Sequence, residues 1–317
     1  MSDHFLFTIF TSTYNRAHTL NRVFDSLCAQ TLRDFEWLVI DDGSTDNTAE
    51  LIASWANSAD FPIRYLKQDH CGKHIAHNLA AQEARGLFFL TLDSDDACFP
   101  NALERMAYHW NTIPAADRGT YAGVEGLCVD QKGKIVGDRF PSSPFDMTLR
   151  ERCYVYRVGG EKWASTLTNI VRAYPFPEIR GTQFIPEGAL WLQIAKKYKN
   201  RCVNESFRMY YIDDDLTGAT LTKRRGLGDN ACGRLHFYTW VLNNDLEYFF
   251  RSPMPFLKAA VILPILAHFA KQSLGVTLRS LPSIRAKAVV LLALPVSVAL
   301  CTFDRIRNQL RTSSCKQ

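Results

Sequence analysis

The sequence predicts an α/β fold in which a mixed, mostly parallel sheet is flanked by helices. Three apolar runs of strand length end in short polar turns, at residues 5–10, 35–40 and 86–92. After the first turn, apolar residues recur at helical spacing between residues 20 and 27. Strand–turn–helix units of this kind build parallel sheets, and ligands gather beyond the carboxyl ends of their strands.

Carboxylates follow two of these three runs. Asp41 and Asp42 come directly after the second run, and the sequence Asp-Ser-Asp-Asp at residues 93–96 follows the third. Mg²⁺ and Mn²⁺ prefer oxygen ligands and keep positions open for the phosphates of a nucleotide. The acid turns therefore indicate a divalent-metal site. A structural role, in which residues 93–96 cap a helix that begins near Pro100, is the alternative.

The chain resembles the family 2 glycosyltransferases, whose nucleotide-sugar-binding fold is the Rossmann-like fold called GT-A. Five motifs in the family's order carry the resemblance: TSTYNR (11–16), SLCAQT (26–31), VIDDGSTD (39–46), GKHIAHN (72–78) and LDSDD (92–96). It is strongest over residues 5–105 and extends more loosely to about 225. A Gln-x-x-Arg-Trp motif is absent from the sequence, which favours the non-processive type found in bacterial surface-polysaccharide synthesis over a processive synthase.

The resemblance implies roles for individual residues. Asp93 and Asp95 match an Asp-x-Asp pair and would hold Mn²⁺ or Mg²⁺, chiefly through Asp95. An aromatic face can stack on a base and a carboxylate can accept its ring N–H, which suits Tyr14 and Asp42. A packed turn aromatic is the alternative for Tyr14. The complete set expected at the donor nucleotide is Thr11, Tyr14, Asn15, Arg16, Asp42, Lys73, Asn78, Asp93 and Ser94.

Zinc binding is a competing interpretation of the segment around residue 74. His74 and His77 would share a helix face, with His70 and Cys71 nearby. The family motif accounts for the same residues, although many relatives carry Arg at the position of His77. Nucleotide binding is therefore preferred to zinc binding.

Glu187 is the candidate general base. It lies in a Pro-Glu-Gly-x-x-Trp stretch that resembles the acceptor-side motif of related enzymes. Complementing a helix dipole is its structural alternative. The implied reaction is a single displacement with inversion, in which Glu187 takes the acceptor's proton while metal at Asp95 stabilises the departing diphosphate.

Basic residues beyond residue 200 could also contact phosphates. Arg208 and the run Lys223-Arg224-Arg225 would do so if residues 213–218 folded over the site. Solvated surface charge is the alternative.

The 317 residues predict one catalytic domain and one appendage. Residues 1–225 would form the catalytic domain, with a nucleotide-binding half (1–105) and an acceptor half (106–225). Residues 226–317 would form a helical, apolar, membrane-associating tail. Nine cysteines without a Cys-x-x-Cys motif, and no signal peptide before the first strand, predict a cytoplasmic location.

Two apolar runs dominate the tail. Residues 254–267 are interrupted by Lys258 and Pro264, whereas residues 288–303 carry no charge and have basic flanks. A simple span needs about 20 apolar residues, so peripheral or monotopic insertion at the cytoplasmic face of the inner membrane is expected. A buried helical hairpin or a dimer interface is the alternative.

The expected partners are a nucleotide-sugar donor, by default a UDP-sugar, and a glycan or polyprenyl-diphosphate-linked acceptor. The net charge of +5 collects in the tail, which argues against nucleic acid. A sugar nucleotidyltransferase would carry a Gly-rich turn after the first strand, and residues 11–16 contain no glycine. A non-catalytic sugar-nucleotide-binding or membrane scaffold protein is the other alternative.

Overall fold

The computed structural model describes residues 4–212 and 226–314, with side chains up to residue 303. Two compact units divide the chain. The sheet unit comprises Met1–Glu178 and Leu190–Leu216, and the helical unit comprises Ile179–Ala189 and Thr217–Gln317.

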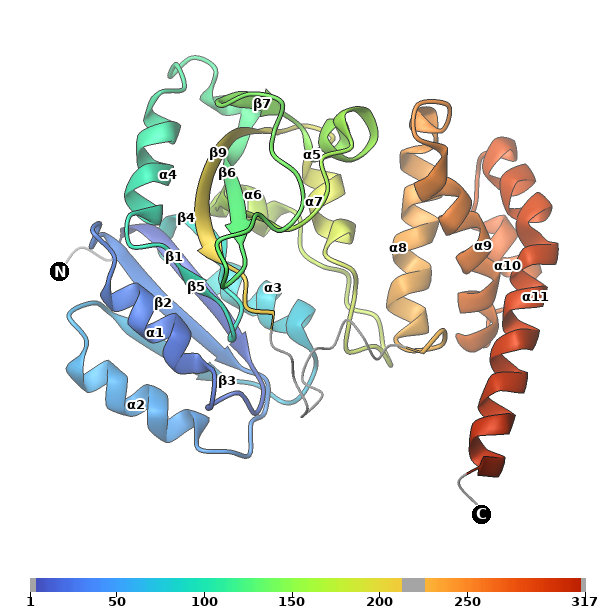
Figure 1. Cartoon of the computed structure of the whole chain (residues 1–317), viewed down its shortest axis with the longest axis horizontal. Helices are drawn as coiled ribbons and strands as arrows, with labels where there is room; N and C mark the ends of the chain where they lie inside the picture. Colours follow the sequence, from blue (N-terminus) through green and yellow to red (C-terminus); the bar gives the residue numbers. More distant parts are fainter. Residues whose placement is uncertain (1–3, 213–225, 315–317) are drawn as a thin grey trace. The chain divides into compact units, whose positions relative to one another are not determined.

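One mixed sheet, with helices on its faces, forms the sheet unit, which confirms the predicted α/β class (Figure 1). Its strand order is β3-β2-β1-β4-β8-β6-β9-β5, and β7 pairs with β9. Strands β3, β2, β1 and β4 are parallel, whereas β8 runs antiparallel to both β4 and β6. The strands are β1 (Phe5–Thr13), β2 (Phe35–Asp41), β3 (Ile63–Lys67), β4 (Gly86–Thr91), β5 (Ala97–Cys98), β6 (Tyr121–Val129), β7 (Phe145–Met147), β8 (Lys162–Leu167) and β9 (Lys199–Met209).

Helices cover both faces of the parallel strands. Phe7 and Ile9 of β1 pack with α1, α2 and α4, whereas Phe10 packs with α3 and α6, because successive side chains point to opposite faces. Covering both faces explains why these strands read as continuous apolar runs. The helices are α1 (Leu20–Cys28), α2 (Thr48–Ser58), α3 (Lys73–Glu83), α4 (Ala102–Asn111), α5 (Leu149–Glu151), α6 (Thr168–Ala173) and α7 (Gly188–Ile194).

The first strand is longer than predicted. It continues through Thr13, which pairs in register with Asp41 of β2. Thr11 and Thr13 are buried despite their polarity, so a turn beginning at residue 11 was the wrong boundary. The register brings the chain after β1 beside the acid turn that follows β2.

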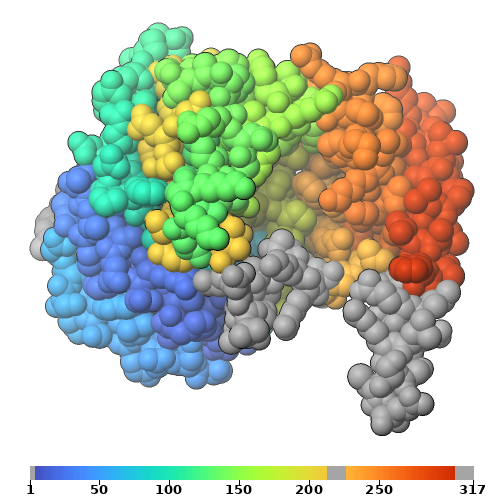
Figure 2. Space-filling model, in the orientation of Figure 1, coloured from blue at the N-terminus to red at the C-terminus, as the bar shows by residue number. Residues whose placement is uncertain are grey.

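The second half of the sheet is built on β6 and β9. These strands are parallel and show register shifts along their length. Figure 2 shows the yellow segment of β9 packed against green segments of the chain, in agreement with its pairing to β6 and β7.

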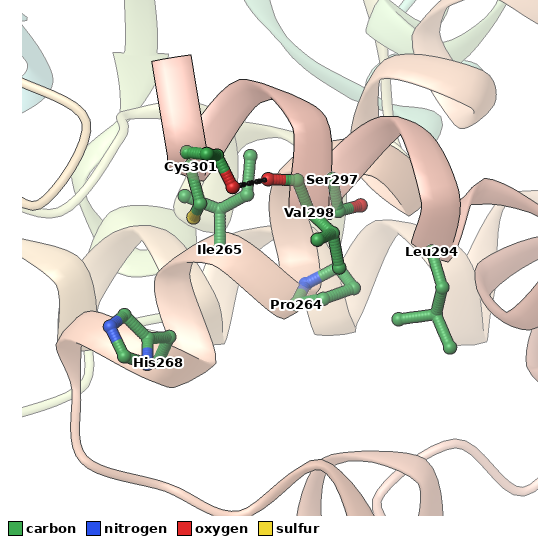
Figure 3. A pocket seen from close by; sticks show the side chains of 8 residues that line it. Pro264, Ile265, His268, Leu294, Ser297, Val298 and Cys301 are labelled. Atoms are coloured by element: carbon green, nitrogen blue, oxygen red, sulfur yellow. Dashed lines mark hydrogen bonds between the residues drawn. The ribbon is translucent and has the colours of Figure 1, made fainter. Parts of the chain in front are cut away.

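The helical unit contains α8 (Ala231–Asn244), α9 (Pro253–Phe269), α10 (Leu274–Arg279) and α11 (Ile284–Ser314). A cavity of about 260 Å³ is lined by Pro264, Ile265 and His268 of α9 and by Leu294, Ser297, Val298, Cys301 and Thr302 of α11 (Figure 3). The Ser297 hydroxyl donates to the Val261 carbonyl at 2.7 Å, which joins the two helices.

The second apolar run is longer than the sequence indicated. Helix α11 extends it back to Ile284, so that residues 284–303 reach the length and apolar composition of a membrane-crossing helix. Only 22% of its most apolar window is buried. These properties are weak support for membrane association, since the core helix of a soluble protein can have the same length and apolar composition.

Candidate active site

The acid turn after β4 comprises residues 93–96. The backbone N–H of Asp96 donates to the carbonyl of Asp93 (3.1 Å), which closes the turn. The N–H of Leu92 donates to a carbonyl of β1, which fixes the turn at the carboxyl edge of the sheet. Helix α4 has Asn101 as its N-cap, so the acid turn does not cap it.

Asp93 is held between two cations. Lys73 Nζ lies 2.6 Å from Oδ1, and Arg208 Nη1 lies 3.5 Å from Oδ2. Burial alone would raise the pKa of Asp93, but the charges of Lys73 and Arg208 outweigh burial and hold the pKa below its usual value. Asp93 therefore remains ionised, with both oxygens already facing positive charge.

Arg208 is a buried link between three acids. Its side chain is 6% exposed, and it faces Asp93, Asp96 (Nε to Oδ2, 3.4 Å) and Glu161 (Nη2 to Oε2, 3.2 Å). The prediction that Arg208 contacts phosphates is therefore corrected: β9 directs this guanidinium to the acids. No local sequence pattern indicated that Arg208 would lie close to Asp93.

The remaining basic residues of that prediction are Lys223, Arg224 and Arg225. They, and segment 213–218, lie outside the described residues.

Asp95 is the less tightly paired acid of the Asp-x-Asp pair. Its side chain is 37% exposed, and Arg16 Nη1 lies 3.8 Å from Oδ2. Arg22 donates to the backbone carbonyl of Asp95 at 3.1 Å. Burial, followed by the charge of Asp93, raises the pKa of the Asp95 carboxyl. A cation placed here would offset that repulsion.

The acid turn fits a divalent ion only in part. Among residues 4–212 and 226–303, no three His, Cys, Asp or Glu side chains are grouped as metal ligands. The prediction of Asp93 as a ligand is at odds with its pairing to Lys73 and Arg208, whereas Asp95 presents a carboxylate of the kind that Mg²⁺ and Mn²⁺ bind. An ion at Asp95 would need further oxygen ligands from a bound diphosphate or water.

The second acid turn orders the loop before α3. The Asp42 carboxylate is 5% exposed and accepts hydrogen bonds from Gln68 Nε2 (2.6 Å) and from the N–H groups of Cys71 (2.9 Å) and Gly72 (2.9 Å). Asp41 instead accepts from the Ser44 N–H of the same turn and from the Tyr65 hydroxyl of β3. Asp42 is thus the acid turned toward the loop of residues 68–72.

Tyr14 lies over this loop. Its side chain is exposed, and its ring stacks on the imidazole of His70 with centroids 3.9 Å apart. Nδ1 of His70 lies 3.0 Å from the Asp42 carboxylate. Tyr14 and Asp42, predicted from separate motifs, are therefore brought together. His70 joins them, a role that the sequence interpretation missed because it placed His70 only in the zinc alternative.

Thr11 and Asn15, two of the predicted nucleotide contacts, make hydrogen bonds within the fold. The Thr11 side chain is fully buried and accepts a hydrogen bond from the Trp37 indole (3.0 Å), so any ligand contact would have to use its backbone. Asn15 has φ 51°, and its Oδ1 accepts from the Thr45 N–H at 2.8 Å. Asn15 therefore cross-links the turns after β1 and β2.

Helix α3 supplies Lys73 and Asn78, with different surroundings. Lys73 is its first residue and reaches Asp93. Both ends of the Asn78 amide bond the backbone of Phe176, at 2.9 and 2.8 Å. A nucleotide contact at Asn78 would have to replace these bonds.

His77 lies in an aromatic cage rather than in a metal site. The rings of Phe10, Phe89, Phe176 and Trp191 surround it at centroid distances of 5.0–6.0 Å. Within the described part of the chain, neither ring nitrogen has a hydrogen-bond partner. Burial and, secondarily, Lys73 lower its pKa to about 3. The zinc alternative is therefore wrong for this residue.

We expect the His77→Leu variant to lose less stability in mild acid than the wild type. The pKa of His77 is 6.5 in its ordinary state and about 3 here, so the unfolded chain takes up the extra proton. Stability that is complete above pH 6.5 is lost as the pH falls toward 3. Through His77, the free energy of unfolding of the wild type should fall by about 2 kcal/mol between about pH 7 and pH 5.

Urea unfolding of wild type and variant at both pH values measures this difference. Burial raises the pKa of Asp96 to about 7, which gives an opposite slope, but that slope is common to both proteins. An equal loss of stability in wild type and His77→Leu would contradict the assignment.

Glu187 and Ser94 complete the predicted set. Glu187 directly precedes α7 and belongs to the helical unit, whereas the acid turns belong to the sheet unit. Ser94 is half-buried within the acid turn. Their functional roles remain predictions.

The comparisons identify the family of residues 8–129. Residues 8–129 match the model described as glycosyl transferase family 2. The chain contains a family 2 glycosyltransferase domain. This domain is similar to an uncharacterized glycosyltransferase of Rickettsia prowazekii (32% identity, 45% of each chain). It is also similar to the chondroitin synthase of Pasteurella multocida (37% identity, 31% of this chain and 10% of that protein). The chain thus spans less than half the length of these relatives.

Solved structures share the fold of the family 2 domain. S. aureus TarS residues 1–349, in complex with UDP-GlcNAc, matches with a TM-score of 0.60 and 19% identity, covering 97% of this chain and 92% of that chain. The mannosyltransferase PcManGT of Pyrobaculum calidifontis, in complex with GDP-Man and Mn²⁺, has a TM-score of 0.50 and 19% identity, over 98% and 84% of the chains. At these identities the likeness establishes the GT-A fold alone.

Proposed function

We propose that this protein is a metal-dependent, inverting glycosyltransferase. It would transfer a sugar from a nucleotide-sugar, by default a UDP-sugar, to a glycan or polyprenyl-diphosphate-linked saccharide in surface-polysaccharide synthesis. The observation that carries the proposal is the acid turn, where Asp95 remains accessible among the cations Arg16, Arg22 and Lys73. Mixed charge of this kind suits a diphosphate that arrives with a divalent ion.

The family 2 domain offers separate contacts for the parts of the donor. Tyr14 and Asp42 would take the base, by stacking and by accepting a ring N–H. Lys73 and Arg16 would attract the diphosphate, and Asp95 would hold Mn²⁺ or Mg²⁺. When bound, the ion supplies charge stabilisation to the leaving diphosphate. TarS and PcManGT, which share the fold, are complexed with UDP-GlcNAc and with GDP-Man and Mn²⁺.

Glu187 would act as the general base. It would accept the proton of the acceptor hydroxyl as that oxygen attacks the anomeric carbon and the bond from this carbon to the diphosphate breaks. The diphosphate leaves from the opposite face, so the configuration at the anomeric carbon inverts. No covalent sugar–enzyme intermediate is needed.

Turnover of the donor tests this function. Purified protein should release UDP or GDP from one of a panel of nucleotide-sugars when Mn²⁺ and a lipid-diphosphate-linked or oligosaccharide acceptor are present. EDTA should abolish the release. Release that EDTA leaves unchanged would contradict metal dependence, and an anomeric product with retained configuration would contradict single displacement.

The helical unit would hold the protein at the cytoplasmic face of the inner membrane. Helix α11 exposes Ile284 (81%), Leu292 (82%) and Val298 (62%). Arg285 and Lys287 add positive charge at its start. Apolar side chains beside basic ones suit an anionic lipid surface, where each basic residue contributes about 1 kcal/mol.

Leu292→Glu combined with Val298→Glu should weaken binding to anionic phospholipid vesicles at least tenfold in cosedimentation. Both side chains are exposed, so the fold should tolerate the change. Leu87→Glu, at a half-exposed position on β4 of the sheet unit, serves as the matched control. Equal vesicle binding by the double variant and wild type would contradict membrane association through α11.

A further inference from the structure

His70 makes two contacts that the proposed function assigns to a nucleobase. Its ring lies on Tyr14, with centroids 3.9 Å apart and planes inclined by 22°. Its Nδ1 lies 3.0 Å from Asp42 Oδ2 and 3.0 Å from the Asp42 carbonyl oxygen. An ionised carboxylate and a carbonyl only accept, so Nδ1 carries the hydrogen. An aromatic face therefore covers Tyr14 while a ring N–H points at Asp42.

There is no room for a base to join these contacts. At 3.9 Å the two rings are in direct contact, so a third ring cannot lie between them. The Asp42 carboxylate is 5% exposed and already accepts from Gln68, Cys71 and Gly72 in addition to His70. The His70 side chain is 38% exposed and is the partner with a route to solvent.

The carboxylate would stay in place if His70 moved away. It accepts hydrogen bonds from the backbone N–H groups of Cys71 and Gly72, which lead into α3. Gly43, with φ 90°, lets the chain at residue 70 approach closely, since a Cβ at residue 43 would lie 3.2 Å from the His70 nitrogen. Main chain therefore fixes Asp42, and the imidazole is an adjustable partner.

We propose that His70 occupies the place of the nucleobase in the nucleotide-free protein and that the base displaces it. This inference rests on the proposed function and names its donor class. Without His70, Asp42 Oδ2 would keep the Gly72 N–H, and a base that placed a bare ring nitrogen beside it would set two acceptors against each other. Uracil, thymine and guanine carry a ring N–H on their pairing edge, whereas adenine and cytosine present a bare ring nitrogen. The donor is therefore a uridine, thymidine or guanosine diphosphate sugar.

Calorimetric titration of the full chain with UDP, dTDP, GDP, ADP and CDP in the presence of Mn²⁺ tests both parts. UDP, dTDP or GDP should bind at least tenfold more tightly than ADP and CDP. His70→Ala should bind the preferred nucleotide three- to tenfold more tightly than wild type, because a filled site lowers apparent affinity by the fraction of open protein. His70→Phe keeps a ring on Tyr14 but loses the N–H, and should fall between them. His4→Ala, exposed before β1, should match wild type.

Three results would overturn the inference. One is equal or weaker binding of the preferred nucleotide by folded His70→Ala, which would make His70 a bystander or a direct base contact. Another is ADP or CDP binding as tightly as the best of UDP, dTDP and GDP. The third is an unchanged His70 imidazole resonance in wild-type NMR spectra when saturating nucleotide is added. If wild type binds none of the five nucleotides, the proposed function itself fails; the other results leave that function standing.

Discussion

Asp95→Asn should lower the turnover number by about a thousandfold. Both acids of the pair are about one-third exposed, at 33% and 37%, but Asp93 is held by Lys73 and Arg208, whereas the Asp95 carboxylate has a longer contact, of 3.8 Å, with Arg16. The amide keeps the size of the side chain but removes the charge that would hold the ion. Steady-state release of nucleoside diphosphate at saturating donor, across a range of Mn²⁺ concentrations, measures the loss.

The stability of Asp95→Asn should change little. Asp95 Oδ2 lies 3.8 Å from Arg16 Nη1, and this ion pair is partly exposed. Such a pair contributes about 0–1 kcal/mol to the free energy of unfolding. Asp25→Asn removes an exposed acid from α1 and is the matched control, expected to keep full activity. Turnover by folded Asp95→Asn within threefold of wild type would place the ion, or the catalytic charge, elsewhere.

Glu187→Gln should reduce turnover by about 10²- to 10⁴-fold, because an amide cannot take the acceptor's proton. The affinity for UDP should remain unchanged, since Glu187 is assigned to the acceptor and not to the nucleotide. Steady-state kinetics with varied acceptor, together with a separate UDP titration, divides the two effects.

Glu178→Gln, at an exposed position in the segment that leads to residue 187, is the matched control and should be active. A loss of UDP affinity in Glu187→Gln with normal turnover at saturation would reverse the assignment. Activity equal to wild type would require another base.

Local sequence patterns predicted three of the four strands β3, β2, β1 and β4, and missed β3. The apolar runs of β1, β2 and β4 are long enough to recognise, and each is buried because helices cover both faces. Thr11 was harder to place: polarity suggested a turn, whereas its hydroxyl is satisfied inside the fold by Trp37. Whether such a residue belongs to a strand or to a turn depends on pairing across the sheet, and this pairing leaves no local signal in the sequence.

The same limit applies to the site. Motif spacing placed Asp42, Tyr14 and Asp95 at strand ends, where the structure has them. It could not show that Arg208 reaches Asp93 from β9, since 115 positions separate them and the contact depends on strand order. His70 was missed for a related reason. Its ring stacks on Tyr14, which lies on a different turn, and this contact depends on the fold.

Thermal unfolding of wild type and Asp95→Asn with UDP, GDP and their sugar conjugates, with and without Mn²⁺, tests the central claim most directly. A ligand that binds only the folded state raises its stability. A Mn²⁺-dependent rise in the melting temperature with one nucleotide, lost in Asp95→Asn, is the result expected of a metal-dependent nucleotide-sugar enzyme. No rise with any nucleotide in the folded wild type would contradict that account and favour a scaffold protein.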